Sequence, residues 1–463
     1  MATAHLQSLP PQAAPGFAQH VRRVGAAVSA VPSSLPPFWI ACALTLIVAH
    51  YQLWGRLNII YKLMGTVVVV LMPFTAGFTR ILVRPAVLWL LLFEAVMVGN
   101  MVIGRYFTVS SLFTTASAPM ILIRSMPFML CGYTLARHPV WERRFMLFVA
   151  AVYWLFAVQD ARGFIAGARA QLGRAEQYAQ TQGFDDTRIG AMYAGAFTYF
   201  APLMLFLAIG LFRLYPTLSK RWRLFVIVMQ LTFTTVAVLS GFGATAVMAF
   251  ISIILLSIYA PVKTIGWRLY YLGVAGGGFA IFDMIRRFFL AQGGKGAAGE
   301  AFLKFTAVVT SLFSGRPADE MASSLEAASS QRSTLLLTSL ETFFRNPLAG
   351  HGFSGEDDLA VGGHSFLCDT AAIFGLSGLL PICLFFGLVV LGLRKSRKFG
   401  GPSWQVSSSS MLVLTLLAGL VMNPYFLSLL SLSYFIFLLL GFALADTELT
   451  CAGEPTRVSR APR

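Results

Sequence analysis

Residues 331–380 combine a group that can transfer protons with groups that can bind phosphate. This stretch contains Arg332, Arg345 and His364, in a chain that is otherwise mostly apolar. Histidine changes its charge near neutral pH. The guanidinium group of arginine binds phosphate oxygens through paired hydrogen bonds and stays charged at any working pH. Such groups next to a membrane helix indicate chemistry on an anionic, lipid-linked substrate.

His364 is the candidate for a catalytic base. It follows Gly362 and Gly363 and directly precedes the apolar run 365–380, which is typical of a membrane helix. The positive end of the helix dipole at an N-terminus favours a neutral imidazole. A neutral imidazole can accept a proton from a sugar hydroxyl. The alternative is a capping or loop histidine that takes part in no reaction.

Three arginines are candidates for binding a diphosphate. Arg332 lies on a helix predicted over about 323–344, and its alternative role is that of a surface arginine beside lipid headgroups. Arg345 follows Glu341 by four residues, a spacing at which an ion pair on one helix is the simpler explanation. Asn346-Pro347 is predicted to end this helix. Arg188 is a comparable cation that directly precedes another predicted apolar helix.

An acidic cluster upstream of His364 contains oxygen ligands of the kind that divalent cations prefer. Consecutive acids in a glycine-rich loop are more often solvated. The sequence also has no P-loop, GxSxG, HExxH or GxGxxG motif in a suitable context. We therefore expect neither a metal ion nor a cofactor. The cluster consists of Glu356, Asp357 and Asp358.

The elements that position these residues are predicted to be membrane helices. Of the 463 residues, 57% are hydrophobic and only 12% are charged, whereas soluble domains carry about 25% charged residues. A spanning helix needs about 20 apolar residues. The sequence therefore predicts an all-α polytopic membrane protein with about 12 transmembrane helices and a large helical periplasmic loop before the third-last helix. The apolar segments are centred near Leu46, Val69, Leu91, Pro127, Val152, Leu205, Gln230, Ile253, Ala275, Phe385, Leu416 and Phe437.

The positions of the basic residues predict the orientation of these helices. The formal net charge is +16, and the cations form short clusters between apolar runs. Placing the N-terminus in the cytoplasm collects most of the clusters on that side, as the positive-inside rule requires. Both termini are then cytoplasmic, and a nucleic-acid partner is disfavoured. The cytoplasmic clusters include Arg80 and Arg84; Arg137, Arg143 and Arg144; Arg213, Lys220, Arg221 and Arg223; and Arg394, Lys395, Arg397 and Lys398.

The predicted organisation has five parts. They are a flexible cytoplasmic tail (1–35), a transmembrane bundle (36–285) with an outer loop (160–190), a large periplasmic loop (286–364), C-terminal transmembrane helices (365–445) and a second cytoplasmic tail (446–463). Arg124 falls inside an apolar run of the bundle. A charge at the centre of a membrane helix costs about 2.5–3.5 kcal/mol on insertion scales. We therefore expect Arg124 to face the protein interior, with Glu94 as its partner.

The succession of motifs in the C-terminal third resembles the bacterial O-antigen ligase and polymerase superfamily, which includes Wzy-type polysaccharide polymerases. Members of this superfamily share a comparable set of membrane helices and a large periplasmic loop toward the C-terminus. The chain departs from many relatives at Phe242, near a position where they have Ser-Arg, and at His364-Ser365, where they have His-Asn. The matching motifs are Arg332, FFRNPLAGHGF (Phe343–Phe353), GGHSFL (Gly362–Leu367) and IFGLSGLLP (Ile373–Pro381).

The resemblance implies glycan transfer between undecaprenyl-diphosphate carriers at the periplasmic face of the bacterial inner membrane. It assigns the catalytic role to His364 and diphosphate binding to Arg332 and Arg188, with Arg345 completing the predicted set. The implied partners are an undecaprenyl-diphosphate-linked oligosaccharide, membrane lipid, a chain-length regulator and a flippase.

Three functions remain open at this point. A polysaccharide polymerase, which extends repeat units on their lipid carrier, is the leading prediction. An O-antigen ligase uses the same donor but transfers the glycan to lipid A-core. A lipid-linked oligosaccharide flippase or another secondary transporter is the third, although the two halves of the chain lack the repeat relationship that transporters commonly show.

Overall fold

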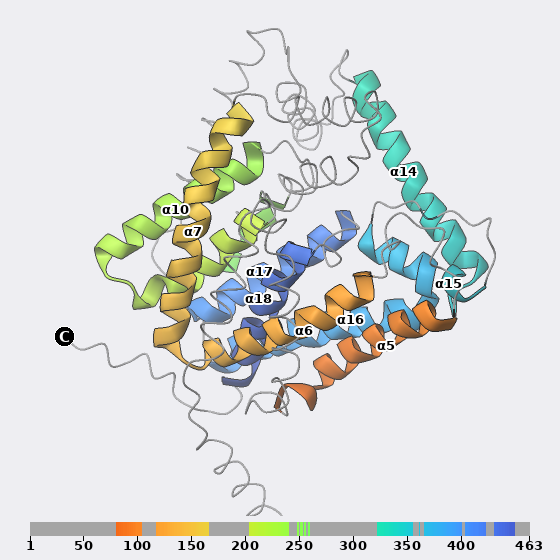
Figure 1. The fold of residues 1–463 in the computed structure, drawn as a ribbon, viewed down its shortest axis with the longest axis horizontal. Coiled ribbons are helices and arrows are strands. Elements are labelled where there is room, and N and C mark those ends of the chain that lie inside the picture. The colour runs from red at the N-terminus through yellow and green to blue at the C-terminus, as the bar shows by residue number, and fades with distance from the viewer. Residues whose placement is uncertain are drawn as a thin grey trace, which may run out of the picture.

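The part of the chain that the structure describes is entirely helical (Figure 1). This computed structural model describes residues 80–103, 117–165, 203–239, parts of 248–259, 322–354, 361, 365–400, 403–422 and 430–449. These residues contain no strand, in agreement with the predicted all-α class. The predicted tail 1–35, most of the outer loop 160–190, and the apolar segments centred near Leu46, Val69 and Ala275 lie outside the described residues. The segment centred near Ile253 is described in part, and the described residues there are helical. Of the second predicted tail (446–463), residues 446–449 continue the helix Leu430–Leu449, and the rest lies outside the described residues.

The other predicted apolar segments coincide with helices. By length and composition, two described helical stretches, Phe366–Lys398 and Trp404–Val421, are able to cross a membrane. The helices are α5 (Pro85–Ile103), α6 (Ser117–Ala136), α7 (Pro139–Ile165), a helix over Leu203–Thr217 that ends in the 3-10 helix η3 (Phe212–Thr217), α10 (Lys220–Leu239), α16 (Phe366–Gly400), α17 (Trp404–Met422) and α18 (Leu430–Leu449).

Proline marks the beginning of two of these helices. Pro85 and Pro139 are the first residues of α5 and α7. Proline is favoured at this position because its fixed φ suits the helix and its missing N–H would have no partner in the first turn. A two-residue turn, Arg137 and His138, separates the end of α6 from the start of α7. α6 and α7 are therefore consecutive helices joined by a basic turn.

Helices α6 and α18 pack so closely that two glycines are required between them. A Cβ atom on Gly132 would lie 1.9 Å from the backbone oxygen of Leu438. A Cβ atom on Gly441 would lie 2.0 Å from the backbone oxygen of Met129. Small residues that allow two backbones to approach are typical of helix pairs in membranes. This pair forms the tightest contact between helices distant in the sequence.

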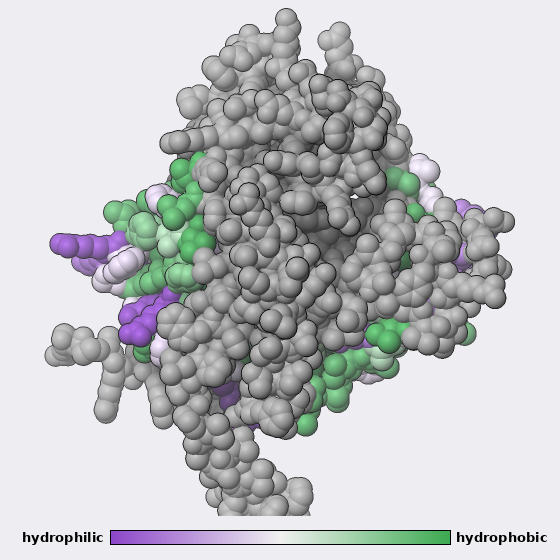
Figure 2. Space-filling model, in the orientation of Figure 1, coloured by the Kyte–Doolittle hydropathy of each residue, from purple (hydrophilic) through white to green (hydrophobic). Residues whose placement is uncertain are grey.

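Several helices expose apolar side chains on the outside of the bundle. Figure 2 shows hydrophobic surface where α10 and α5 reach the edge of the molecule. On α7 and α16, Leu155 and Leu391 are 66% and 59% exposed. Soluble proteins rarely expose large continuous apolar surface, whereas lipid chains make such exposure favourable. The exposed apolar residues of α10 are Trp222, Leu224, Phe225, Val228 and Leu231.

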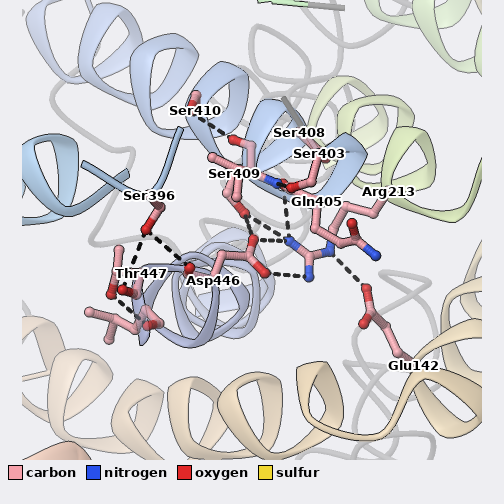
Figure 3. A network of polar contacts seen from close by, with 12 residues as sticks. Glu142, Arg213, Ser396, Ser403, Gln405, Ser408, Ser409, Ser410, Asp446 and Thr447 are labelled. Atoms are coloured by element: carbon pink, nitrogen blue, oxygen red, sulfur yellow. Dashed lines mark hydrogen bonds and ion pairs between the residues drawn. The ribbon is translucent and has the colours of Figure 1, made fainter. Parts of the chain in front are cut away.

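A buried ionic network joins the ends of four helices (Figure 3). Arg213, which is 3% exposed, donates from Nε to Glu142 Oε1 at 2.8 Å and from Nη2 to Asp446 Oδ1 at 3.1 Å. Ser409 Oγ accepts a hydrogen bond from Arg213 Nη1 at 2.8 Å and donates one to Asp446 Oδ2 at 2.6 Å. A buried charge is tolerated when it is paired and hydrogen-bonded in this way. We call these four residues the Arg213 network.

A second, half-buried cluster of charged residues lies near the C-terminal end of α18. Arg84 Nη2 is 2.7 Å from Glu448 Oε2, and Arg137 Nη2 forms an ion pair with the same oxygen. Tyr133 donates its hydroxyl hydrogen to Glu448 and accepts a hydrogen bond from Arg137 Nη2 at 2.7 Å. The guanidinium of Arg137 also lies over the Tyr133 ring, 4.5 Å from its centroid. These contacts join the beginning of α5 to the ends of α6 and α18.

These contacts bring members of three predicted cytoplasmic clusters to one end of the bundle. Arg84, Arg137 and Arg213 all contact carboxylates near the C-terminal end of α18. The beginnings of α5 and α7 therefore lie beside the ends of α6 and α18. Arg213 is buried and paired with two carboxylates.

Candidate active site

The structure describes the four predicted site residues to different extents. Backbone and side chain of Arg345 are both described. Arg332 lies on α14 (Ala322–Arg345), but its side chain is outside the described part. His364 and Arg188 lie outside the described residues. The structure therefore shows how the segments that contain Arg332 and His364 are joined, and the closeness of the two side chains stays a prediction.

Helix α14 confirms the helix predicted over about 323–344. It ends at Arg345, directly before Asn346-Pro347, because proline disfavours the helical conformation of the residue before it. In Figure 1 its C-terminal end lies close to the short helix α15 (His351–Ser354) and the end of α5. Ser339 and Thr342 are buried, whereas Leu337 and Phe344 are exposed. One side of α14 thus packs against α16.

The turn that follows α14 docks onto a break in α16. Gly375 interrupts the helix with φ 60° and ψ −154°, a left-handed conformation that favours glycine. The break releases two backbone N–H groups. Leu376 donates to the carbonyl of Pro347 at 2.7 Å, and Ser377 donates to the carbonyl of Leu348 at 3.1 Å. Buried backbone donors need such partners. Residues 346–350, which we call the docking turn, supply them.

The docking turn leaves no room for a side chain at its final residue. Gly350 has φ 73°, and a Cβ atom there would lie 2.3 Å from the carbonyl oxygen of Ile373. Two positions further on, a Cβ on Gly352 would lie 2.3 Å from Asn100 Nδ2 on α5. Contact between the two backbones therefore requires the glycines of NPLAGHG. The motifs Phe343–Phe353 and Ile373–Pro381, which the sequence shows only as separate strings, meet directly.

The first turn of α16 is fixed by reciprocal hydrogen bonds. The backbone N–H of Cys368 donates to Ser365 Oγ at 3.3 Å, which makes Ser365 the N-cap of the helix. The backbone N–H of Ser365 donates to Asp369 Oδ2, also at 3.3 Å. Asp369 Oδ1 accepts a hydrogen bond from Ser339 Oγ of α14 at 2.6 Å. Asp369 is 1% exposed and therefore connects the two helices inside the protein.

Sequence reasoning did not single out Asp369, Ser339 or Asn100. The sequence does contain a signal for Asp369 and Asn100, because both are polar residues within apolar runs. Polar groups in membrane segments are costly and usually have a structural or functional role. Asn100 is 3% exposed, and within the described part of the chain its Nδ2 has no hydrogen-bond partner. Ser339 carries no such signal, since a serine on an amphipathic helix is unremarkable.

Arg345 forms the ion pair that its spacing predicted. Its Nη2 lies 2.7 Å from Glu341 Oε1, and the two side chains are 57% and 67% exposed. Solvent screens an exposed pair, so its contribution to stability is small. The pair leaves Arg345 accessible at the end of α14, beside the docking turn. Its role in substrate binding stays a prediction.

Replacing Glu341 by glutamine is expected to change the free energy of unfolding by less than about 0.5 kcal/mol. The substitution removes the attraction to Arg345 but keeps the shape of the side chain. Thermal unfolding of the purified protein in detergent measures the effect. A shift corresponding to more than about 1 kcal/mol would contradict the weak, screened pair that the exposure indicates.

The predicted partner of Arg124 is buried. Glu94, on α5, is 6% exposed, and its Oε1 has no hydrogen-bond partner among the residues that the structure describes. The side chain of Arg124 lies outside the described part of α6, so this pairing stays a prediction. The acidic cluster Glu356–Asp358 also lies outside the described residues. Within the described residues, no group of three or more His, Cys, Asp or Glu side chains is arranged to bind a metal ion.

Comparison of the chain with protein-family models gives no match, and comparison with curated proteins gives none either. The part of the chain that the structure describes is all-helical, and two of its helices are long and apolar enough to cross a membrane.

Proposed function

We propose that this protein is a multi-pass enzyme of the bacterial inner membrane. It would polymerise undecaprenyl-diphosphate-linked oligosaccharide repeat units into a surface polysaccharide or exopolysaccharide. The proposal includes about 12 transmembrane helices, cytoplasmic termini and a periplasmic active site. The observation that carries it is the docking of the turn at 346–350 onto the break at Gly375.

This contact supports the proposal because it unites the motifs on which the resemblance depends. IFGLSGLLP donates two backbone hydrogen bonds to carbonyl groups of FFRNPLAGHGF, and GGHSFL leads into the same helix at Ser365. Motifs that matched by chance would have no reason to meet. Their meeting supports one functional unit formed by the end of α14, the docking turn and the first part of α16.

The placement of charges along α16 supports a periplasmic position for this unit. The part of α16 that follows the break at Gly375, residues 376–400, corresponds to about 37 Å of regular helix, which exceeds the apolar thickness of a membrane of about 30 Å. Its C-terminal end contains Arg394, Lys395, Arg397 and Lys398, a cluster typical of the cytoplasmic side. With that end in the cytoplasm, the first turn of α16 would lie at the opposite face.

In the proposed reaction, His364 accepts the proton of the attacking hydroxyl group of the acceptor sugar. The acceptor oxygen forms a bond to the anomeric carbon of the donor, and the bond from that carbon to the diphosphate oxygen breaks. Undecaprenyl diphosphate leaves with the negative charge. Arg332 and Arg188 would bind the diphosphate and stabilise this charge, which is electrostatic catalysis by groups already in place. Arg345 is the third candidate for contact with the diphosphate.

The test uses purified protein in liposomes with lipid-linked repeat units as the only substrate. The parent protein is expected to produce a ladder of longer glycans. His364→Ala should lower turnover by at least about 100-fold, the usual contribution of a general base. Arg332→Ala should also lose most of the activity. The matched control is Arg144→Ala, which removes an exposed arginine of a predicted cytoplasmic cluster and should retain the activity.

The same assay separates the polymerase from its alternatives. Full-length product from both His364→Ala and Arg332→Ala, at normal protein levels, would overturn the proposed function. Transfer that occurs only after addition of a lipid A-core acceptor would identify a ligase instead. Movement of the lipid-linked substrate between leaflets without elongation would identify a transporter.

A further inference from the structure

We infer that Asp369 is a positioning residue: its carboxylate fixes the segment that contains His364 relative to the helix that contains Arg332. This inference rests on the proposed function, because it assigns a role to Asp369 in the same reaction. Asp369 itself is not expected to touch the substrate. Its contribution is to the geometry between the proposed base and the proposed diphosphate site.

The first step of the argument is the contact between Asp369 and Ser365. The carboxylate oxygen Oδ2 accepts the backbone N–H of Ser365 at 3.3 Å, and the N–H of Asp369 donates to the carbonyl of Ser365 at 2.8 Å. Ser365 is thus held from both its amide and its carbonyl. His364 is joined to this residue by a single peptide bond. Any reorientation of the Ser365 amide must therefore alter the path of the chain at His364.

The second step is the contact between Asp369 and α14. Oδ1 of the same carboxylate accepts the hydroxyl hydrogen of Ser339 at 2.6 Å. Ser339 follows Arg332 by seven residues, or about two helical turns. One carboxylate therefore links the helix that contains Arg332 to the amide next to His364, with one oxygen for each partner.

The third step is burial. Asp369, Ser339 and Ser365 are 1%, 0% and 0% exposed. Hydrogen bonds in such surroundings are not in competition with bulk water, and a group that loses its partner there stays unsatisfied. A carboxylate is also a stronger hydrogen-bond acceptor than a neutral group. The position therefore favours a rigid connection over a flexible one.

A purely structural role for Asp369, as an anchor between α14 and α16, makes a different prediction. An anchor would affect the folding of the protein and the binding of substrate together. A positioning residue affects the chemical step selectively, because misplacement of a reacting group by about 1 Å can lower the rate about 100-fold. The division of the effect between kcat and KM therefore separates the two roles.

The experiment compares Asp369→Ala, Asp369→Asn and Ser339→Ala in the full-length protein, in the liposome elongation assay. Asp369→Ala is expected to lower kcat by about 100-fold with KM changed less than about threefold, since the arginines remain. Asp369→Asn keeps one acceptor oxygen and should lose less. The matched control is Ser396→Ala, another serine that is 0% exposed and donates to a neighbouring helix, at the far end of α16. Its kcat should stay within about twofold of the parent.

Hydrogen–deuterium exchange provides a readout that does not depend on activity. The amide of Ser365 is expected to exchange faster in Asp369→Ala and Ser339→Ala than in the parent, and at the parental rate in Ser396→Ala. Ser339→Ala removes only a neutral hydroxyl group and decides the question if the Asp369 variants do not accumulate as folded protein.

Three results would overturn the inference. They are a kcat within about twofold of the parent in the folded Asp369 variants, a rise in KM that accounts for the whole loss, and equal losses in Ser339→Ala and Ser396→Ala. The proposed function has a separate failure: an active His364→Ala variant removes the reaction itself. An inactive His364→Ala beside a fully active Asp369→Ala would refute only the positioning role.

Discussion

Substitution of Arg213 by methionine is expected to destabilise the protein by about 3–5 kcal/mol, a large share of the stability of a typical domain. Arg213 is 3% exposed and forms ion pairs with both Glu142 and Asp446, which are themselves buried. Methionine fills a similar volume but has no charge. The two carboxylates then lose the cation between them in surroundings that solvate ions poorly.

The measurement is the amount of folded protein in the membrane and its thermal unfolding after purification. Arg345→Met is the matched control, because it removes an exposed arginine from a screened pair and should change stability by less than about 0.5 kcal/mol. Combining Arg213→Met with Glu142→Gln and Asp446→Asn should recover part of the loss, since no uncompensated charge remains. An Arg213→Met protein as stable as the control would contradict the network of Figure 3.

Replacing Gly132 by leucine is expected to prevent the packing of α6 against α18. A Cβ atom at this position would lie 1.9 Å from the backbone oxygen of Leu438, a distance at which one backbone must move. No rotamer of leucine can relieve this clash, because the position of Cβ is fixed by the backbone. Overpacking of a core usually lowers the free energy of unfolding by about 1–3 kcal/mol. We expect a larger loss here, because the clash is with a backbone atom that cannot rotate away. We expect little or no folded protein.

Gly387→Leu is the matched control for this substitution. Gly387 also lies in an apolar helix, α16, but no atom lies within 4 Å of a Cβ atom built there. Leucine also favours a helix more than glycine does. Size-exclusion chromatography of both variants as fluorescent fusions would show whether each forms a single folded species. Equal peaks for Gly132→Leu and Gly387→Leu would mean that α6 and α18 are farther apart than described.

The sequence predicts the local features of the fold well because each has a local cause. Apolar length identifies α16 and α17, and helical spacing identifies α14. Asn346-Pro347 marks the end of α14, as found. The ion pair between Glu341 and Arg345 follows from a separation of four residues on one helix. Each of these predictions needs only the residues of a single segment.

The sequence does not predict the contacts between segments. Arg213 and Asp446 are 233 residues apart, and Ser339 and Asp369 are 30 apart. Nothing in a local pattern selects one carboxylate among several as the partner of a given cation. Gly375 looks the same in sequence as a glycine inside a regular helix, yet it breaks α16 because the docking turn supplies replacement hydrogen-bond acceptors. The framework of the candidate site therefore became visible only in three dimensions.

The position of the acidic partners near the end of α18 sets an order for biogenesis. Glu448 follows Arg137 by 311 residues, and Asp446 follows Arg213 by 233. Translation proceeds from the N-terminus at about 5–20 residues per second, so α5 and α6 emerge from the ribosome many seconds before α18. The bonds to Glu448 and Asp446 can form only after that delay. A nascent chain that stalls before Asp446 would thus leave Arg137 without Glu448 and Arg213 with Glu142 alone, and such an intermediate is a natural substrate for membrane proteases.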